Sequence, residues 1–156
     1  MTEATKVGEA REVGAPLAGA VIPLSEVNDE VFASGMVGRG VAVVPQATGR
    51  IEVVAPLGGT LKQVLPHAFI VMDEAGAGIL VHVGIDTVEL GGTGFEVHKA
   101  KGDEVRAGEP VVTIDAPAIA AAGYDLTCPV VAMAGEMGEP LAAGEVERGQ
   151  ALYRVR

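Results

Sequence analysis

Cysteine and aromatic residues are scarce in this sequence. Its 156 residues include one cysteine and no tryptophan, and aromatic residues make up 3% of the chain. A single cysteine excludes an internal disulfide bond and favours a reducing, cytoplasmic setting. Stability must therefore come from an aliphatic core, and a chain of this length can bury such a core as one domain.

Long apolar runs are also absent, and basic residues are fewer than acidic ones. No run approaches the roughly 18 apolar residues that a membrane-spanning helix needs, and the N-terminal stretch MTEATKVGEA lacks the parts of a secretion signal. With 21 acidic and 11 basic residues, the formal net charge is −10. This charge argues against a nucleic-acid partner and suits a basic protein partner. We therefore expect a cytoplasmic protein without a direct membrane span.

Glycine, proline and valine are plentiful instead. The 22 glycines and 9 prolines predict short strands joined by tight turns. Three consecutive strand candidates, VAVVPQ, GRIEVVAP and GTLKQVLP, each close on a proline: Pro45, Pro56 and Pro66. We predict an all-β fold, an antiparallel β-sandwich or barrel-sandwich hybrid. Residues 1–15 are expected to be a flexible tail, and residues 16–156 a single domain.

One turn-plus-strand unit occurs twice. The segment GDEVRAGEPVVTI (102–114) aligns with AGEVERGQALYRV (143–155), which indicates an internal repeat in the β fold. The fold should also contain one or two short helices. The clearest candidate is 116–122, preceded by Asp115 as a potential cap. The glycine-rich stretch 25–40 is interpreted as a loop.

The most informative stretch is Leu80 to Leu90, LVHVGIDTVEL. In an extended strand, successive side chains point to opposite faces, so His82, Gly84 and Asp86 should share one face. That face carries an imidazole, a bare backbone position and a carboxylate. The opposite face would carry aliphatic side chains only, those of Val81, Val83 and Ile85. The pattern indicates a site on the polar face.

A second histidine, His67, begins the apolar run HAFIVM upstream. If residues 73–76 form a four-residue hairpin loop, Met72 pairs with Ala77, and the antiparallel register then places His67 opposite His82. A slip of one residue would turn the two imidazoles to opposite faces of the sheet.

These residues alone allow two kinds of chemistry. Gly84 removes a side chain beside the imidazole of His82, which makes room for a phosphorylated donor or a metal-bound water. His67 and His82 with Asp86 would supply three zinc ligands and leave one open position, as in catalytic zinc sites. The spacing does not choose between the two.

Four ordered motifs go further: VFASGMVGRGVAV, LPHAFIV, ILVHVGIDTVELGGTGFE and KGDEVRAGEPVV. Over residues 20–131 the chain resembles the glucose-type enzyme IIA (EIIA type 1) components of the bacterial phosphoenolpyruvate-dependent sugar phosphotransferase system. The resemblance implies an antiparallel β-sandwich. It also implies a phosphotransferase that accepts a phosphoryl group from the histidine-containing carrier protein and passes it to a cysteine of enzyme IIB, which serves the membrane enzyme IIC.

The resemblance also assigns roles to the two histidines. By motif, His82 is the phosphorylated residue, through Nε2, and His67 assists from beside it. We expect Nδ1 of His82 to donate a hydrogen bond to a backbone carbonyl, most directly that of Gly84. Many family members carry a threonine two residues before the first histidine, and this chain has Leu65 there. We therefore expect a backbone group to support His67.

Partner-binding residues are predicted around His82. A carboxylate in contact with the phosphoryl group would repel it, so Asp86 and Glu89 are expected to surround the site and pair with arginines of the carrier protein. Gly84 is expected to leave a gap through which the partner's phosphohistidine approaches. The apolar part of this surface is predicted from four aliphatic residues, namely Val37, Val43, Val64 and Leu80.

A metal gives the alternative function. No resident cofactor is expected, although family members can hold zinc between the two histidines in a regulatory complex, here His67 and His82. The pattern H-x-G-x-D of His82 and Asp86 is also found in zinc metallopeptidases of the lysostaphin type. Such enzymes need a second motif, H-x-H, further along the chain. His98 is the only histidine downstream, so the phosphocarrier is the favoured function.

Overall fold

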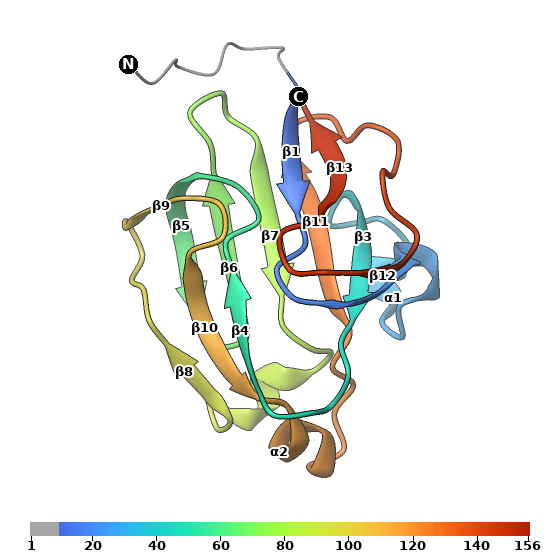
Figure 1. The fold of residues 1–156 in the computed structure, drawn as a ribbon, viewed down its shortest axis with the longest axis vertical. Helices are drawn as coiled ribbons and strands as arrows, with labels where there is room; N and C mark the ends of the chain where they lie inside the picture. Colours follow the sequence, from blue (N-terminus) through green and yellow to red (C-terminus); the bar gives the residue numbers. More distant parts are fainter. Residues whose placement is uncertain (1–9) are drawn as a thin grey trace.

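A computed structural model describes residues 10–156, which form antiparallel sheets stacked as a β-sandwich (Figure 1). The strands are β1 (Arg11–Gly14), β2 (Gly19–Pro23), β3 (Arg39–Val44), β4 (Arg50–Val54), β5 (Gly59–Leu65), β6 (Ala68–Met72), β7 (Gly78–His82), β8 (Phe95–Val97), β9 (Glu104–Val105), β10 (Pro110–Asp115), β11 (Cys128–Ala134), β12 (Gly144–Val146) and β13 (Ala151–Val155). The predicted fold class is confirmed.

Three sheets organise these strands. The largest has eight strands in the order β12-β2-β3-β11-β7-β6-β5-β9. A three-stranded sheet, β4-β10-β8, and a two-stranded sheet, β1-β13, face it (Figure 1). Aliphatic side chains fill the space between them, and among the largest fully buried residues are Tyr153, Phe69, Leu17 and Leu61. The Tyr153 hydroxyl donates to the carbonyl of Val130 at 3.0 Å, so this buried polar group is satisfied.

The predicted tail ends too late along the chain. Arg11–Gly14 forms strand β1, which pairs antiparallel with β13, and Val13 is fully buried in the core. The boundary at residue 15 is therefore wrong, because main-chain hydrogen bonds and an apolar side chain fix this segment. The rest of the predicted tail, residues 1–9, lies outside the described residues.

The internal repeat is present and is larger than predicted. β9 and β10 correspond to β12 and β13, as the alignment of 102–114 with 143–155 indicates. A second pair was missed: EVGAPLAG (12–19) matches EVVAPLGG (52–59). These two segments bond to each other reciprocally, since Gly14 N donates to Pro56 O at 2.8 Å and Val54 N to Pro16 O at 2.9 Å. The eight-stranded sheet accordingly has corresponding strands on both sides of its centre, where Val81 pairs with Val130.

Short helices complete the fold. The predicted helix at 116–122 is confirmed as α2 (Ala116–Ala121), and the carboxylate of Asp115 accepts from Ala118 N at 3.2 Å. The stretch 25–40, predicted as a loop, contains part of the 3-10 turn η1 (Leu24–Glu26) and the helix α1 (Glu30–Ala33). Apolar contacts with the outer face of the large sheet stabilise this short helix. A third element, η2 (Thr87–Leu90), follows β7.

Candidate functional site

His82 is the last residue of β7, and the strand pattern does not continue past it. Gly84 has a φ of 82° and Asp86 a φ of 60°, so the chain turns immediately after the strand. Ile85 consequently packs in the outer apolar cluster with Phe32, while Val81 and Val83 lie in the inner core. The predicted alternation is correct to Val83 and wrong at Ile85, because these turns reverse the side-chain direction.

The hairpin that brings the histidines together is shifted by one residue from the prediction. Ala68, not His67, pairs with His82, and Met72 pairs with Gly78. The carboxylate of Asp73 accepts hydrogen bonds from Ala75 N at 3.1 Å and Ala77 N at 2.9 Å, which fixes the conformation of the loop. Sequence period alone does not reveal such a side-chain cap.

The two imidazoles nevertheless meet. His67 lies in the turn before β6, where side chains do not follow the alternation of a strand, and its carbonyl accepts from Val83 N at 2.6 Å. The ring centroids of His67 and His82 are 5.2 Å apart, with an interplanar angle of 74°. The expected backbone support of the His67 ring is not seen among residues 10–156, where its ring makes no hydrogen bond.

A hydrogen bond fixes the orientation of His82. Its Nδ1 lies 2.6 Å from the carbonyl oxygen of Gly84. A carbonyl can only accept, so Nδ1 carries the proton and the neutral ring keeps its lone pair on Nε2. The predicted donor and acceptor are confirmed.

Gly84 therefore has a different role from the predicted gap. It is buried, and a Cβ at this position would lie 2.5 Å from Cγ2 of Thr87. The residue allows a left-handed turn that presents its carbonyl to His82. It does not leave an opening toward a partner.

The surroundings of His82 keep its ring neutral. Phe32 of α1 packs against it with ring centroids 5.0 Å apart. Burial lowers the pKa of His82, while the bond to Gly84 and the carboxylates of Asp29 and Asp86 oppose this effect. Burial and the nearby charge of His82 also lower the pKa of His67. At neutral pH both rings are therefore uncharged, which is the state in which an imidazole nitrogen is a nucleophile.

Asp29 and Phe32 were missed as site residues. Both belong to α1 and its cap, where the Asp29 carboxylate accepts from Val31 N at 2.9 Å. The helix lies far from His82 in sequence, and only the packing of Phe32 brings it to the ring. The available signal was the capping residue before a short apolar run, VFA.

The predicted partner-facing residues divide into two groups. Asp86 and Glu89 are exposed, and Glu89 accepts from the Tyr124 hydroxyl at 3.1 Å. Half-buried positions are occupied by three of the predicted aliphatic residues, Val37, Val64 and Leu80. Val43 is fully buried in the inner core, so its assignment to the surface is wrong. Alternate residues of β3 face the core, and Val43 is one of them.

Exposed apolar side chains near the site come from other positions. Met36 is 80% exposed, Val88 59% and Val31 50%. Val31 lies in α1, which contacts His82 through Phe32, and Val88 lies in η2, which follows His82 in the chain. Met36 lies in the segment after α1. Exposed apolar side chains are therefore present on both elements next to His82.

The zinc alternative requires a third ligand beside His67 and His82. Within residues 10–156, no group of three or more histidine, cysteine, aspartate or glutamate side chains is placed to hold a metal ion. His98 bonds instead to Thr113, with 2.6 Å between Nε2 and Oγ1. The three-ligand arrangement of His67, His82 and Asp86 is thus not formed.

Comparison with known proteins decides the family. The family model described as "phosphoenolpyruvate-dependent sugar phosphotransferase system, EIIA 1" matches residues 11–137. The chain belongs to this family. An EIIA type 1 domain is a phosphoryl carrier in sugar transport, so the resemblance stated from the motifs is confirmed. No helix in residues 10–156 has the length and apolar character needed to cross a bilayer.

Relatives of the EIIA domain are both separate and fused. The chain is 44% identical over 121 residues to the PTS system glucose-specific EIIA component of Oceanobacillus iheyensis, covering 76% of this chain and 72% of that protein. It is 45% identical over 145 residues to the PTS system beta-glucoside-specific EIIBCA component of Dickeya chrysanthemi, covering 90% of this chain. The chain spans 22% of that fused protein, and 19% to 22% of the first five curated relatives.

A solved structure supports the same fold. Glucose permease IIA from Mycoplasma capricolum superposes with a TM-score of 0.88 at 35% sequence identity, over 96% of this chain and 97% of that chain. The sandwich described above is therefore the fold of the family.

Proposed function

We propose that Nε2 of His82 accepts a phosphoryl group from the phosphohistidine of the histidine-containing carrier protein and passes it to the cysteine of an enzyme IIB. This transfer would serve sugar uptake through a membrane enzyme IIC. One observation carries this proposal. The 2.6 Å contact between Nδ1 and the Gly84 carbonyl directs the lone pair of the neutral ring to Nε2. A nucleophile held in one tautomer needs no rearrangement before it attacks.

The transfer itself is an in-line displacement. The lone pair of Nε2 forms the new N–P bond while the N–P bond of the donor histidine breaks, and the donor ring keeps that electron pair. The proton stays on Nδ1 of His82 throughout, and its bond to the Gly84 carbonyl stabilises the positive character that the phosphorylated ring acquires. Onward transfer repeats the displacement with a cysteine thiolate as the nucleophile.

His67 assists from beside this centre. With its ring centroid 5.2 Å from that of His82, an N–H of His67 would donate to a phosphoryl oxygen on Nε2. A hydrogen bond to a charged phosphoryl oxygen is about twice as strong as one between neutral groups. If His67 has this role, replacing its ring should slow the onward transfer of the phosphoryl group and still allow His82 to be phosphorylated.

The carrier protein would dock on the surface around His82. Asp86 and Glu89 are exposed there, and Asp29 lies close enough to His82 to act on its pKa. Basic side chains of the carrier would pair with these carboxylates, and the exposed aliphatic residues would pack against its apolar ones. Docking through exposed charges should weaken as the salt concentration rises.

Phosphorylation with purified enzyme I, the carrier protein and phosphoenolpyruvate tests the proposal. Intact-mass measurement should show one acid-labile phosphoryl group on the parent protein and on the control His98→Gln, and none on His82→Gln. His67→Gln should gain the group and pass it to enzyme IIB at least tenfold more slowly. A phosphorylated His82→Gln protein would overturn the proposed site, and parental transfer by His67→Gln would remove His67 from the mechanism.

A zinc ion shared with a partner is a second proposal for the same pair. The two imidazoles supply nitrogen donors at the surface, and a partner would have to complete the tetrahedral shell, because residues 10–156 offer no third ligand nearby. Isothermal titration should show weak zinc binding to the chain alone, and His67→Gln should abolish it. Tight stoichiometric zinc without a partner would contradict this arrangement.

A further inference from the structure

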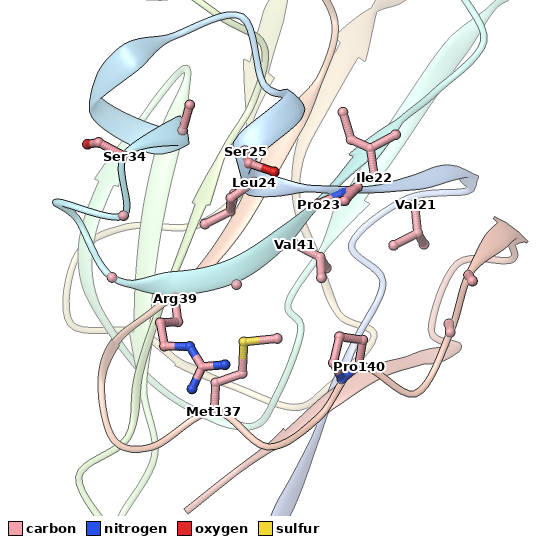
Figure 2. Close-up of a pocket in the computed structure, with 16 residues that line it drawn as sticks. Val21, Ile22, Pro23, Leu24, Ser25, Ser34, Arg39, Val41, Met137 and Pro140 are labelled. Atoms are coloured by element: carbon pink, nitrogen blue, oxygen red, sulfur yellow. The ribbon is translucent and has the colours of Figure 1, made fainter.

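A hollow of about 470 Å³ opens beside β2, β3 and the end of α1 (Figure 2). Phe32 of α1 contacts His82, whereas the next residue, Ala33, lines the hollow. Strands β2 and β3 form one wall, and residues between Met137 and Ala143 form the other. Volumes of about 300–1,000 Å³ are typical of small-molecule sites.

The internal repeat explains why this space is open. Val21, Val41 and Met137 line it, and the strand registers make them equivalent to Leu61, Phe69 and Phe95. In the other half of the molecule, larger side chains thus occupy each of the three positions. The hollow lies where smaller side chains leave the corresponding volume unfilled.

One charged group belongs to this apolar surface. Arg39 is the only charged residue among the described lining residues, and the remainder are aliphatic, proline, glycine, alanine, methionine or serine. Figure 2 shows its guanidinium beside Met137, with Val41 and Pro140 across the hollow. Arg39 takes part in none of the ion pairs found within residues 10–156. A guanidinium without a carboxylate partner favours an anion, since it presents several N–H donors in a planar fork.

We propose that this hollow binds a small amphipathic carboxylate of the medium-chain fatty acid class. The carboxylate would bond to the Arg39 guanidinium, and the aliphatic chain would lie against Val21, Val41 and Met137. A single negative charge suits the site better than several do, because the chain carries a formal net charge of −10 and would repel a polyanion. The binding does not depend on phosphoryl transfer at His82.

Titration with sodium octanoate, followed by amide NMR, tests the proposal. Saturable shifts should appear at Ala33, Gly40 and Met137, and both acetate and 1-octanol should bind at least tenfold more weakly. Arg39→Gln should lower the affinity for octanoate at least tenfold. The matched control is Arg50→Gln, which removes an exposed arginine that pairs with Glu96 and should bind as the parent does.

Two filling variants follow from the repeat. Met137→Phe and Val21→Leu copy the larger equivalents Phe95 and Leu61, and each should weaken octanoate binding at least tenfold while circular dichroism shows a folded protein. The proposal is overturned if octanoate causes no saturable shift in the parent or binds equally to Arg39→Gln. It is equally overturned if octanol binds as tightly or if both folded filling variants bind like the parent.

Discussion

At the scale of single residues, Gly84 combines two properties that the site needs. Its φ of 82° is a conformation that side-chain-bearing residues rarely adopt, and its carbonyl accepts from Nδ1 of His82 at 2.6 Å. A methyl group there would also meet Thr87, with 2.5 Å to Cγ2. The tautomer of His82 thus depends on a residue that offers only a backbone carbonyl to the ring.

Gly84→Ala should therefore destabilise the folded protein. Backbone strain and the clash with Thr87 together should lower the free energy of unfolding by roughly 3 kcal/mol, measured by urea denaturation. Gly76→Ala is the matched control, because Gly76 has a φ of 93° and no atom lies within 4 Å of the position that a Cβ would take there. That control should lose about 1–2 kcal/mol from strain alone. Equal losses would show that Thr87 does not constrain the turn.

The histidine pair should make stability depend on pH. Burial lowers the pKa of both His67 and His82 from the ordinary value of 6.5, so the unfolded chain takes up protons first as the pH falls. The contribution of the two histidines to the free energy of unfolding is complete above pH 6.5. It is lost as the pH falls toward their pKa values in the folded protein. The free energy of unfolding should fall less between about pH 7.5 and 5.5 for the double variant, His67→Gln with His82→Gln, than for the parent. Urea denaturation at the two pH values measures it. An identical decline would contradict the lowered pKa values.

Residue-level prediction succeeded where the chemistry is local. The bond from His82 to the Gly84 carbonyl joins residues two apart, and both the tautomer and the acceptor follow from the motif. Asp29 and Phe32 were missed because a separate helix brings them to the ring. Val43 was misplaced because an aliphatic residue in a strand has no sequence signature that separates the surface from the core.

At the scale of elements, the β6–β7 hairpin depends on Asp73. Its carboxylate accepts from Ala75 N and Ala77 N in the turn and pairs with Arg11 of β1 at 2.7 Å, where both side chains are largely buried. One carboxylate therefore fixes the loop and joins the hairpin to another sheet. This explains why a prediction based on strand period alone erred by one residue.

Asp73→Ala should destabilise the protein by about 3–5 kcal/mol in urea denaturation, because it removes the turn cap and leaves the Arg11 charge without this partner. Asp103→Ala is the control. Asp103 likewise caps a turn, accepting from Ala100 N at 2.9 Å, but this bond is exposed. The control should lose about 1 kcal/mol. A loss that small for Asp73→Ala would mean that the ion pair with Arg11 contributes nothing.

At the scale of the whole molecule, the internal repeat comprises two pairs of similar segments, 102–114 with 143–155 and 12–19 with 52–59. The strand candidates and the repeat at 102–114 and 143–155 were visible because apolar residues alternate with turn glycines. The match of EVGAPLAG with EVVAPLGG was equally visible, and it identifies 11–15 as structural. The tail prediction failed because it rested on local composition, which does not reveal a repeat.

Truncating equivalent side chains in the two halves should lower the free energy of unfolding by similar amounts. Val13 and Val53 occupy matching places in the repeat, and each has 0% exposure. Val13→Ala and Val53→Ala should each lower the free energy of unfolding by about 1–3 kcal/mol. Val97→Ala, at an exposed position, should change it by less than about 0.5 kcal/mol. A Val13→Ala protein as stable as the parent would restore the tail interpretation.

The pairing of β1 with β13 also has a kinetic consequence. These strands come from the two ends of the described chain, with Arg11 opposite Val155. Contacts between residues so distant in sequence form slowly, because a long stretch of chain must be ordered before they are gained. During synthesis, β1 must wait for β13, the last of the described strands to emerge. The buried face of β1 therefore stays exposed to aggregation until β13 has been made.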